Sequence, residues 1–203
     1  MSERTHQLGV DLRGVSSHVL HVCTANQIRS AMAERMMRAA LLARHGAAAD
    51  DLIVTSAGVQ AWPGVPMFPE ALAELRRRGI DAADFRSTVI DPDLVDGARL
   101  VLVATRWHRD MVLAVAPNAA AYVFTWRELA RLLADADRAD VTGDTLPERA
   151  AGLALLAARR RRVTRRPAAD EVDVADPIGG PVEGYRRAAD EIDAALATIV
   201  ALL

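Results

Sequence analysis

The chain has 203 residues, 51% of them hydrophobic, which suits one domain with a sizeable core. Its formal net charge of −2 gives no indication of a nucleic-acid or membrane-surface partner, and no apolar run approaches the length of a membrane span. All 25 basic residues are arginine, which excludes lysine-dependent chemistry, and the single cysteine excludes internal disulfides and favours a reducing, cytoplasmic location.

Apolar β-prone runs alternate with amphipathic helical patterns along most of the chain. Residues 1–17 are polar, contain no signal-peptide segment and are predicted to form a flexible tail. The predicted strands span residues 18–23, 51–58, 98–105 and 120–125, and the predicted helices span residues 29–45, 70–79, 106–115, 126–136, 147–162 and 180–203. This alternation predicts one α/β domain over residues 18–203, with a central four-stranded parallel sheet flanked by helices.

The weakest structural pattern lies between about residues 135 and 175, which we interpret as an expanded surface segment. Within it, residues 159–166 carry six arginines and are followed by the acidic residues 170–176. A basic docking patch and a solvated helix end balanced by its acidic neighbour both fit this run. The second interpretation is favoured, because charge runs usually lie on solvated faces.

The only cysteine, Cys23, ends the first predicted strand, and Arg29 opens the following helix after five intervening residues. A loop of this length can surround a tetrahedral anion with backbone N–H groups, and the helix N-terminus adds positive potential that favours a thiolate. Arg29 can bind two phosphate oxygens, Ser30 is placed to donate to the thiolate, and Asn26 suits a left-handed position. The spacing alone leaves open whether Cys23 is a nucleophile or a buried structural thiol.

Residues 22–34, VCTANQIRSAMAE, resemble the signature V-C-x-G-N-x-C-R-S-P-x-A-E of the low-molecular-weight protein tyrosine phosphatases. The family's S-A-G at a strand end is matched by residues 56–58, and its aromatic-bearing loop by residues 61–64. Its D-P motif before a final helix is matched by residues 176–177, with two glycines a short distance beyond. Because the motifs occur in order and at suitable distances, the resemblance is specific, and it implies a phosphotyrosine protein phosphatase I-like fold.

The resemblance implies a two-step phosphatase mechanism without a metal or another cofactor. Cys23 would attack phosphorus and form a phosphocysteine, Arg29 would stabilise the phosphoryl oxygens, and Asp176 would act first as acid and then as base. The implied phosphate-binding loop comprises Thr24, Ala25, Asn26, Gln27, Ile28 and Ser30. The implied supporting residues are Ser56, which would brace Asn26, Pro177, which would stiffen the acid's loop, and Trp62, which would wall the entrance.

Several residues have competing interpretations or depart from the family pattern. Trp62 could equally fill the edge of the core, Asp91 precedes a second Asp-Pro that we interpret as loop, and His108 is expected on a helix surface. Three departures bear on the phosphate loop or its support. Ala25 replaces a glycine and would cost about 1 kcal/mol if that position required a positive φ, Ile28 replaces the second cysteine, and Phe85 stands where histidine is frequent.

The expected substrates are a phosphorylated protein or a small phosphate ester, with inorganic phosphate as product. We expect a monomer or weak homodimer that binds neither nucleic acid nor membrane. One alternative is a non-catalytic phosphate-binding module that keeps the fold for regulation. Another is arsenate reduction with an external thiol, because a chain with one cysteine cannot pass a disulfide along further cysteines of its own.

Overall fold

The computed structural model describes residues 17–203. The predicted tail, apart from Ser17, lies outside the described residues. The chain folds around a parallel sheet of β1 (His18–Cys23), β2 (Ile53–Gly58), β3 (Ala98–Val103) and β4 (Val123–Thr125), in the order β2-β1-β3-β4. This arrangement confirms the predicted fold class. The fourth strand is shorter than predicted, because the short 3₁₀ helix η2 (Pro117–Ala121) takes up its expected start.

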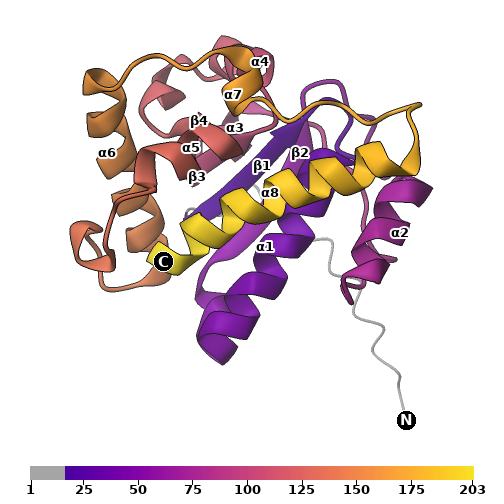
Figure 1. The fold of residues 1–203 in the computed structure, drawn as a ribbon, viewed down its shortest axis with the longest axis horizontal. Coiled ribbons are helices and arrows are strands. Elements are labelled where there is room, and N and C mark those ends of the chain that lie inside the picture. The colour runs from indigo at the N-terminus through magenta and orange to yellow at the C-terminus, as the bar shows by residue number, and fades with distance from the viewer. Residues whose placement is uncertain (1–16) are drawn as a thin grey trace.

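Two layers of helices cover the sheet, as Figure 1 shows for α1 and α8 on one face. The longer helices are α1 (Arg29–His45), α2 (Pro69–Arg77), α4 (Arg106–Val115), α5 (Trp126–Leu133), α6 (Leu146–Val163) and α8 (Val182–Leu202). The shorter ones are α3 (Pro92–Asp96), α7 (Ala169–Val172), η1 (Gly46–Asp51) and η3 (Arg138–Asp140). In the described part of the chain, no helix combines the length and the hydropathy needed to cross a membrane.

Alternating side chains of the strands feed two separate hydrophobic cores, as the period of a β-strand requires. Val19 and Cys23 of β1 belong to the core shared with α1, α5, α6 and α8, whereas Leu20 and Val22 belong to the core shared with α3 and α4. Since the carboxyl ends of parallel strands meet at one edge, Cys23 lies beside Gly58, the end of β2. This edge carries the candidate site.

The segment predicted to be weakly structured is largely helical. Helix α6 packs apolar side chains into the larger core, among them Ala150, Leu153 and Ala157. Its Thr145 N-cap accepts from Glu148 N–H, and the Glu148 carboxylate accepts from Thr145 N–H, which forms a capping box. The helix therefore has both a buried face and a defined start.

The arginine run at the end of α6 is balanced by nearby carboxylates, although not only by the acidic stretch after it. Arg165 pairs with Glu171 of that stretch, but Arg161 pairs with Glu128 of α5. The Arg161 guanidinium also lies 3.8 Å from the centre of the Phe124 ring. Part of the run therefore packs α6 against the sheet, and the interpretation as a purely solvated helix end is wrong for Arg161.

The expectation that Asp91-Pro92 forms a loop is also wrong. The Asp91 carboxylate accepts a hydrogen bond of 2.8 Å from Leu94 N–H and caps α3, with Pro92 in its first turn. Aspartate is a strong N-cap, and proline suits the first helical position because its missing N–H would have no helical partner there. This Asp-Pro pair therefore has a structural role.

His21 of β1 is a fully buried histidine in the larger core. Its Nδ1 accepts a hydrogen bond of 2.9 Å from Trp126 Nε1–H, and its Nε2 lies 3.3 Å from the Met37 sulfur. Burial, assisted by the positive charge of Arg38, lowers the pKa of His21 to about 3. The ring is therefore neutral and serves as a hydrogen-bond acceptor for the indole.

We expect His21 to make the fold sensitive to acid. The folded pKa is below the unfolded value of 6.5, so between these two values the unfolded chain binds a proton at His21 and the folded chain does not. The free energy of unfolding should fall by roughly 2 kcal/mol between about pH 8 and about pH 5 from this group alone. His21→Asn keeps an acceptor for Trp126 without the titration. Urea unfolding at several pH values should therefore show a smaller slope in this variant, and an identical slope would contradict the assignment.

Candidate active site

The loop between Cys23 and Arg29 is held by its carbonyl groups. Val59 N–H, Gln60 N–H and Phe68 N–H donate to the carbonyl oxygens of residues 23, 24 and 27, at 3.0, 2.8 and 3.0 Å. By contrast, none of the backbone N–H groups of residues 24–28 donates to an acceptor within residues 17–203, and Ile28 offers no side-chain cap to α1. Five free donors at a helix N-terminus are the arrangement that binds tetrahedral anions.

Close contact with β2 fixes the shape of this loop. A Cβ atom at Gly58 would lie 2.6 Å from the Thr24 carbonyl oxygen and 2.8 Å from Asn26 N, so only glycine fits. Asn26 adopts φ 54°, the left-handed conformation that its residue type tolerates. Steric contact with the loop therefore explains why the third residue of the S-A-G motif is glycine.

A chain of polar side chains runs beneath the loop. Ser30 Oγ–H donates to the Cys23 sulfur at 3.0 Å, and the Asn26 amide donates to Ser30 and Ser56 at 2.9 and 2.8 Å. The Asn26 side-chain oxygen, Oδ1, accepts from Thr88 N–H at 2.7 Å. Both contacts expected from the sequence, Ser30 to the thiol and Ser56 to Asn26, are present. Cys23 is 3% exposed, and Ser30 links its sulfur to this chain.

Glu34 extends this chain and was given no role from the sequence. Its carboxylate accepts a short hydrogen bond from Ser56 Oγ–H and pairs with Arg38 at 3.0 Å. Burial raises the pKa of Glu34, and the neighbouring Arg38 opposes that rise. Glu34 is the last residue of the signature, and Arg38 follows it at the i, i+4 spacing of a helical ion pair. These two features are the sequence signal that could have indicated a role for Glu34.

Arg29 connects the loop to the segment that carries Asp176, 147 residues away. One guanidinium nitrogen donates to the Val174 carbonyl at 3.0 Å, and the other contacts Thr24 Oγ1 at 3.3 Å and pairs with Asp176. Arg29 is 3% exposed, whereas the Asp176 side chain is 38% exposed. The structure therefore brings three predicted residues, Cys23, Arg29 and Asp176, to one end of the sheet.

The segment before Asp176 is tied to the carboxyl edge of the sheet. Val174 N–H donates to the Ala104 carbonyl, the Asp173 carboxylate accepts from Arg106 N–H, and Thr125 Oγ–H donates to the Val172 carbonyl, at 2.9, 2.9 and 2.7 Å. Beyond Asp176, Pro177 is buried and its carbonyl accepts from Gly180 N–H at 2.9 Å. Hydrogen bonds on both sides of Asp176 therefore fix its position.

His108 is not on a surface, as the sequence suggested, but 2% exposed beside the loop. Its Nε2 lies 3.0 Å from Thr24 Oγ1, and its Nδ1 lies 2.7 Å from Thr105 Oγ1, the N-cap of α4. Burial first, and the Arg29 charge second, lower the pKa of His108 to about 3. The T-x-x-H spacing after a buried strand indicates Thr105 as an N-cap, but it does not show which way His108 faces.

The remaining residues singled out from the sequence differ in their burial and their contacts. Trp62 is 79% exposed, so it does not fill the core edge, and its backbone carbonyl accepts from Ser87 Oγ–H. Ile28 and Phe85 are buried in the larger core, and the Arg35 guanidinium lies 5.6 Å from the centre of the Phe85 ring. Ala25 and Gln27 are half-buried loop residues.

Ala25 carries no backbone strain. The positive-φ residues other than glycine within the described chain are Ser17 and Asn26, so the cost considered for alanine at this position does not arise. Ala25→Gly should therefore lower the free energy of unfolding by about 0.4–1 kcal/mol, because glycine gives the unfolded chain more freedom. Thermal unfolding measures this change, and activity should stay within a few-fold of the parent. A gain in stability would show that Ala25 is strained.

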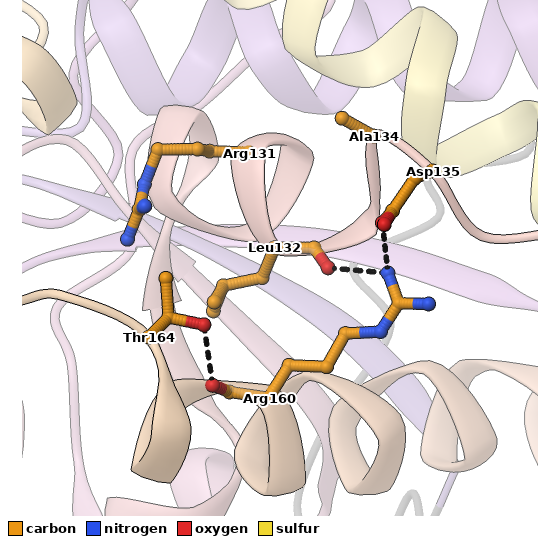
Figure 2. A pocket seen from close by; sticks show the side chains of 6 residues that line it. All are labelled: Arg131, Leu132, Ala134, Asp135, Arg160 and Thr164. Atoms are coloured by element: carbon orange, nitrogen blue, oxygen red, sulfur yellow. Dashed lines mark hydrogen bonds and ion pairs between the residues drawn. The ribbon is translucent and has the colours of Figure 1, made fainter.

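A cavity of about 360 Å³ lies between α5 and α6, and no residue of the loop between Cys23 and Arg29 lines it (Figure 2). Arg160 bridges it by donating to the Leu132 carbonyl and pairing with Asp135, at 2.9 and 2.5 Å. No predicted site residue lines this cavity. Within residues 17–203, no group of three His, Cys, Asp or Glu side chains is arranged to hold a metal ion.

Comparison with known proteins agrees with this geometry. Residues 18–142 match the family model described as low molecular weight phosphotyrosine protein phosphatase. The chain is 30% identical to a protein-arginine-phosphatase of Geobacillus stearothermophilus over 86% of its own length and 88% of the relative's. It is 32% identical to the probable low molecular weight protein-tyrosine-phosphatase EpsP of Ralstonia solanacearum, over 55% of this chain and 71% of that one.

The fold also resembles solved structures of low molecular weight protein tyrosine phosphatases. It superimposes on the low molecular weight protein tyrosine phosphatase from T. tengcongensis with a TM-score of 0.66 and 28% identity, covering 93% of this chain and 100% of that one. On the family model, the relatives and the fold, this chain belongs to the low molecular weight phosphotyrosine protein phosphatase family.

Proposed function

We propose that this protein hydrolyses phosphate groups on protein side chains, with Cys23 as nucleophile and Asp176 as acid and base. The observation that carries the proposal is the convergence of a thiol, a guanidinium and a carboxylate on a loop with five free N–H groups. Membership of a phosphatase family supports it. A pure phosphate-binding module would have no need of the carboxylate.

The proposed first step forms a phosphocysteine. The Cys23 thiolate attacks phosphorus while the bond to the leaving group breaks. Asp176, which takes up a proton once the phosphate has displaced it from Arg29, gives that proton to the leaving atom. Arg29 and the loop N–H groups stabilise the charge on the phosphoryl oxygens, and Ser30 stabilises the thiolate. An entering phosphate competes with Asp176 for Arg29, so substrate binding itself would release the acid.

The second step regenerates the enzyme. Asp176, now a carboxylate, accepts a proton from water, whose oxygen attacks phosphorus. The sulfur–phosphorus bond breaks, which restores the thiolate and yields inorganic phosphate. Asn26, Ser56 and Glu34 would keep the loop in one shape through both steps, because their hydrogen bonds do not involve the phosphate.

Two phosphorylated side chains are candidates for the substrate. Phosphotyrosine is the first, because the family model and the EpsP relative carry that specificity in their names. Phosphoarginine is the second, because the Geobacillus protein-arginine-phosphatase matches 86% of this chain, compared with 55% for EpsP. Trp62, exposed beside the site's S-A-G strand, would contact the substrate's apolar portion in either case.

The test is phosphate release in the presence of a metal chelator. We expect hydrolysis of p-nitrophenyl phosphate, inhibited by vanadate, and selective hydrolysis of one of two matched peptides that carry phosphotyrosine or phosphoarginine. The peptide with the higher kcat/KM identifies the substrate class. Phosphate binding without release from any substrate would contradict the proposal and favour the non-catalytic module.

A further inference from the structure

The contact between His108 and Thr24 has no part in the mechanism above. We propose that His108 is a positioning residue that holds the Thr24 hydroxyl so that its proton points into the phosphate loop and donates to the substrate's phosphoryl group. The inference rests on the proposed function. Thr24 directly follows Cys23, so a donor at this side chain would act beside the reacting sulfur.

The Thr24 oxygen is an acceptor for Arg29. A guanidinium has only donors, so its contact of 3.3 Å with Thr24 Oγ1 requires a lone pair of that oxygen. The proton of Thr24 therefore points elsewhere, either to His108 Nε2 or into the loop. Which ring nitrogen of the neutral His108 carries the proton decides between the two directions.

The hydrogen bonds of Thr105 favour a donor at His108 Nε2. Thr105 Oγ1 accepts from His108 N–H as the N-cap of α4, and its other partner is His108 Nδ1 at 2.7 Å. If Nδ1 carried the proton, the Thr105 hydroxyl proton would have no acceptor among the hydrogen bonds of residues 17–203. With the proton on Nε2 it is instead the Thr24 proton that stays free, and in the proposed reaction a bound phosphoryl oxygen would accept that proton. If Thr105 donates to Nδ1 instead, the neutral ring carries its single proton on Nε2 and donates to Thr24.

This direction leaves one proton in the chain for the substrate. Thr24 Oγ1 then accepts from both His108 and Arg29, and both of its lone pairs are used. Its own proton is free at a half-buried position in the loop, where a phosphoryl oxygen can accept it. Two donors, one of them charged, also polarise the hydroxyl and make it a stronger donor.

The neutral state of His108 fits this arrangement. The ring is 2% exposed and lies near the Arg29 charge, so a second proton is disfavoured. Trp107 covers it with an edge-on contact of 4.9 Å between ring centres. His108 would therefore remain a fixed donor throughout the pH range in which the phosphatase is assayed, and the Thr24 contact would not be interrupted by protonation.

The test is a double-mutant cycle with a conservative rescue. His108→Leu should lower kcat/KM for p-nitrophenyl phosphate about tenfold, as expected for one charge-assisted donor. His108→Gln places an amide N–H near the position of Nε2 and should recover most of the loss. Thr24→Val should cost about as much as His108→Leu, and Thr24→Ser, which keeps the hydroxyl, should cost little.

The decisive comparison is His108→Leu in the Thr24→Val background. If His108 acts through Thr24, it should lower kcat/KM by less than about twofold there. Independent, multiplying losses, or a glutamine variant as impaired as the leucine variant, would overturn the inference. Thermal unfolding identifies variants that fail to fold. If His108→Leu fails to fold, the comparison of Thr24→Val with Thr24→Ser still tests the role of the hydroxyl. An inactive parent protein would refute the proposed function instead.

Discussion

Replacing Cys23 with serine is expected to abolish turnover and to leave phosphate binding intact. A serine hydroxyl is a much weaker nucleophile, and removal of a nucleophile from a hydrolase lowers kcat by about 10⁶-fold. On the proposed mechanism, phosphate affinity should depend on other groups, namely Arg29 and the free N–H groups of the loop. Steady-state hydrolysis of p-nitrophenyl phosphate and calorimetric titration with inorganic phosphate measure the two properties separately.

Cys23→Ala is the matched variant for this experiment. It also removes the nucleophile, but it deletes the partner of Ser30 Oγ–H, which then has the Ala57 carbonyl at 3.3 Å as its remaining acceptor. Both variants should bind phosphate and neither should turn over. Parental activity in either would show that the sulfur is not the nucleophile. Loss of binding in both would show that the loop depends on Cys23 for its shape.

The sequence predicted the parts of this site that lie close together in the chain. The strand, loop and helix around Cys23 arise from an apolar run, a polar turn and an amphipathic pattern within 28 residues of sequence, 18–45. Asn26 could be assigned its left-handed conformation from residue type alone. These are local preferences, and no distant contact opposes them.

The residues that sequence reasoning misplaced depend on contacts between distant segments. His108 meets Thr24 across 84 positions, and helical periodicity does not show that the first turn of α4 faces the end of β1. Arg161 meets Glu128 across 33 positions, and a run of arginines gives no sign of which one turns inward. In both cases tertiary packing decides between two faces that the local pattern leaves equivalent.

The two Asp-Pro pairs show the same limit in another form. Both are turn formers by composition, and only the residues C-terminal to each pair distinguish them in the sequence. In the structure, Asp91 uses its carboxylate to cap α3, whereas Asp176 pairs with Arg29 and is 38% exposed. The difference lies in the partner each carboxylate finds, and the partner of Asp176 is 147 positions away.

Replacing Asp176 with alanine should slow hydrolysis by about 10²–10⁴-fold, the usual contribution of a general acid. The loss should grow as the leaving group becomes more basic, since a poor leaving group needs the proton most. A series of substituted phenyl phosphates measures this dependence. Asp91→Ala is the control: it should cost about 1 kcal/mol of stability through the lost cap and leave kcat unchanged. Equal rates for the Asp176→Ala and parent proteins would refute the assignment.

The same variant should bind phosphate more tightly than the parent. Asp176 pairs with Arg29 in the ligand-free protein, so an entering phosphate must displace a carboxylate from the guanidinium it uses. Asp176→Ala removes both the acid and this competitor, whereas Asp176→Asn removes the acid and keeps an uncharged acceptor for Arg29. Both variants should hydrolyse the ester much more slowly than the parent. Phosphate affinity should rise most in the alanine variant, because a neutral amide still competes for Arg29, though more weakly than a carboxylate.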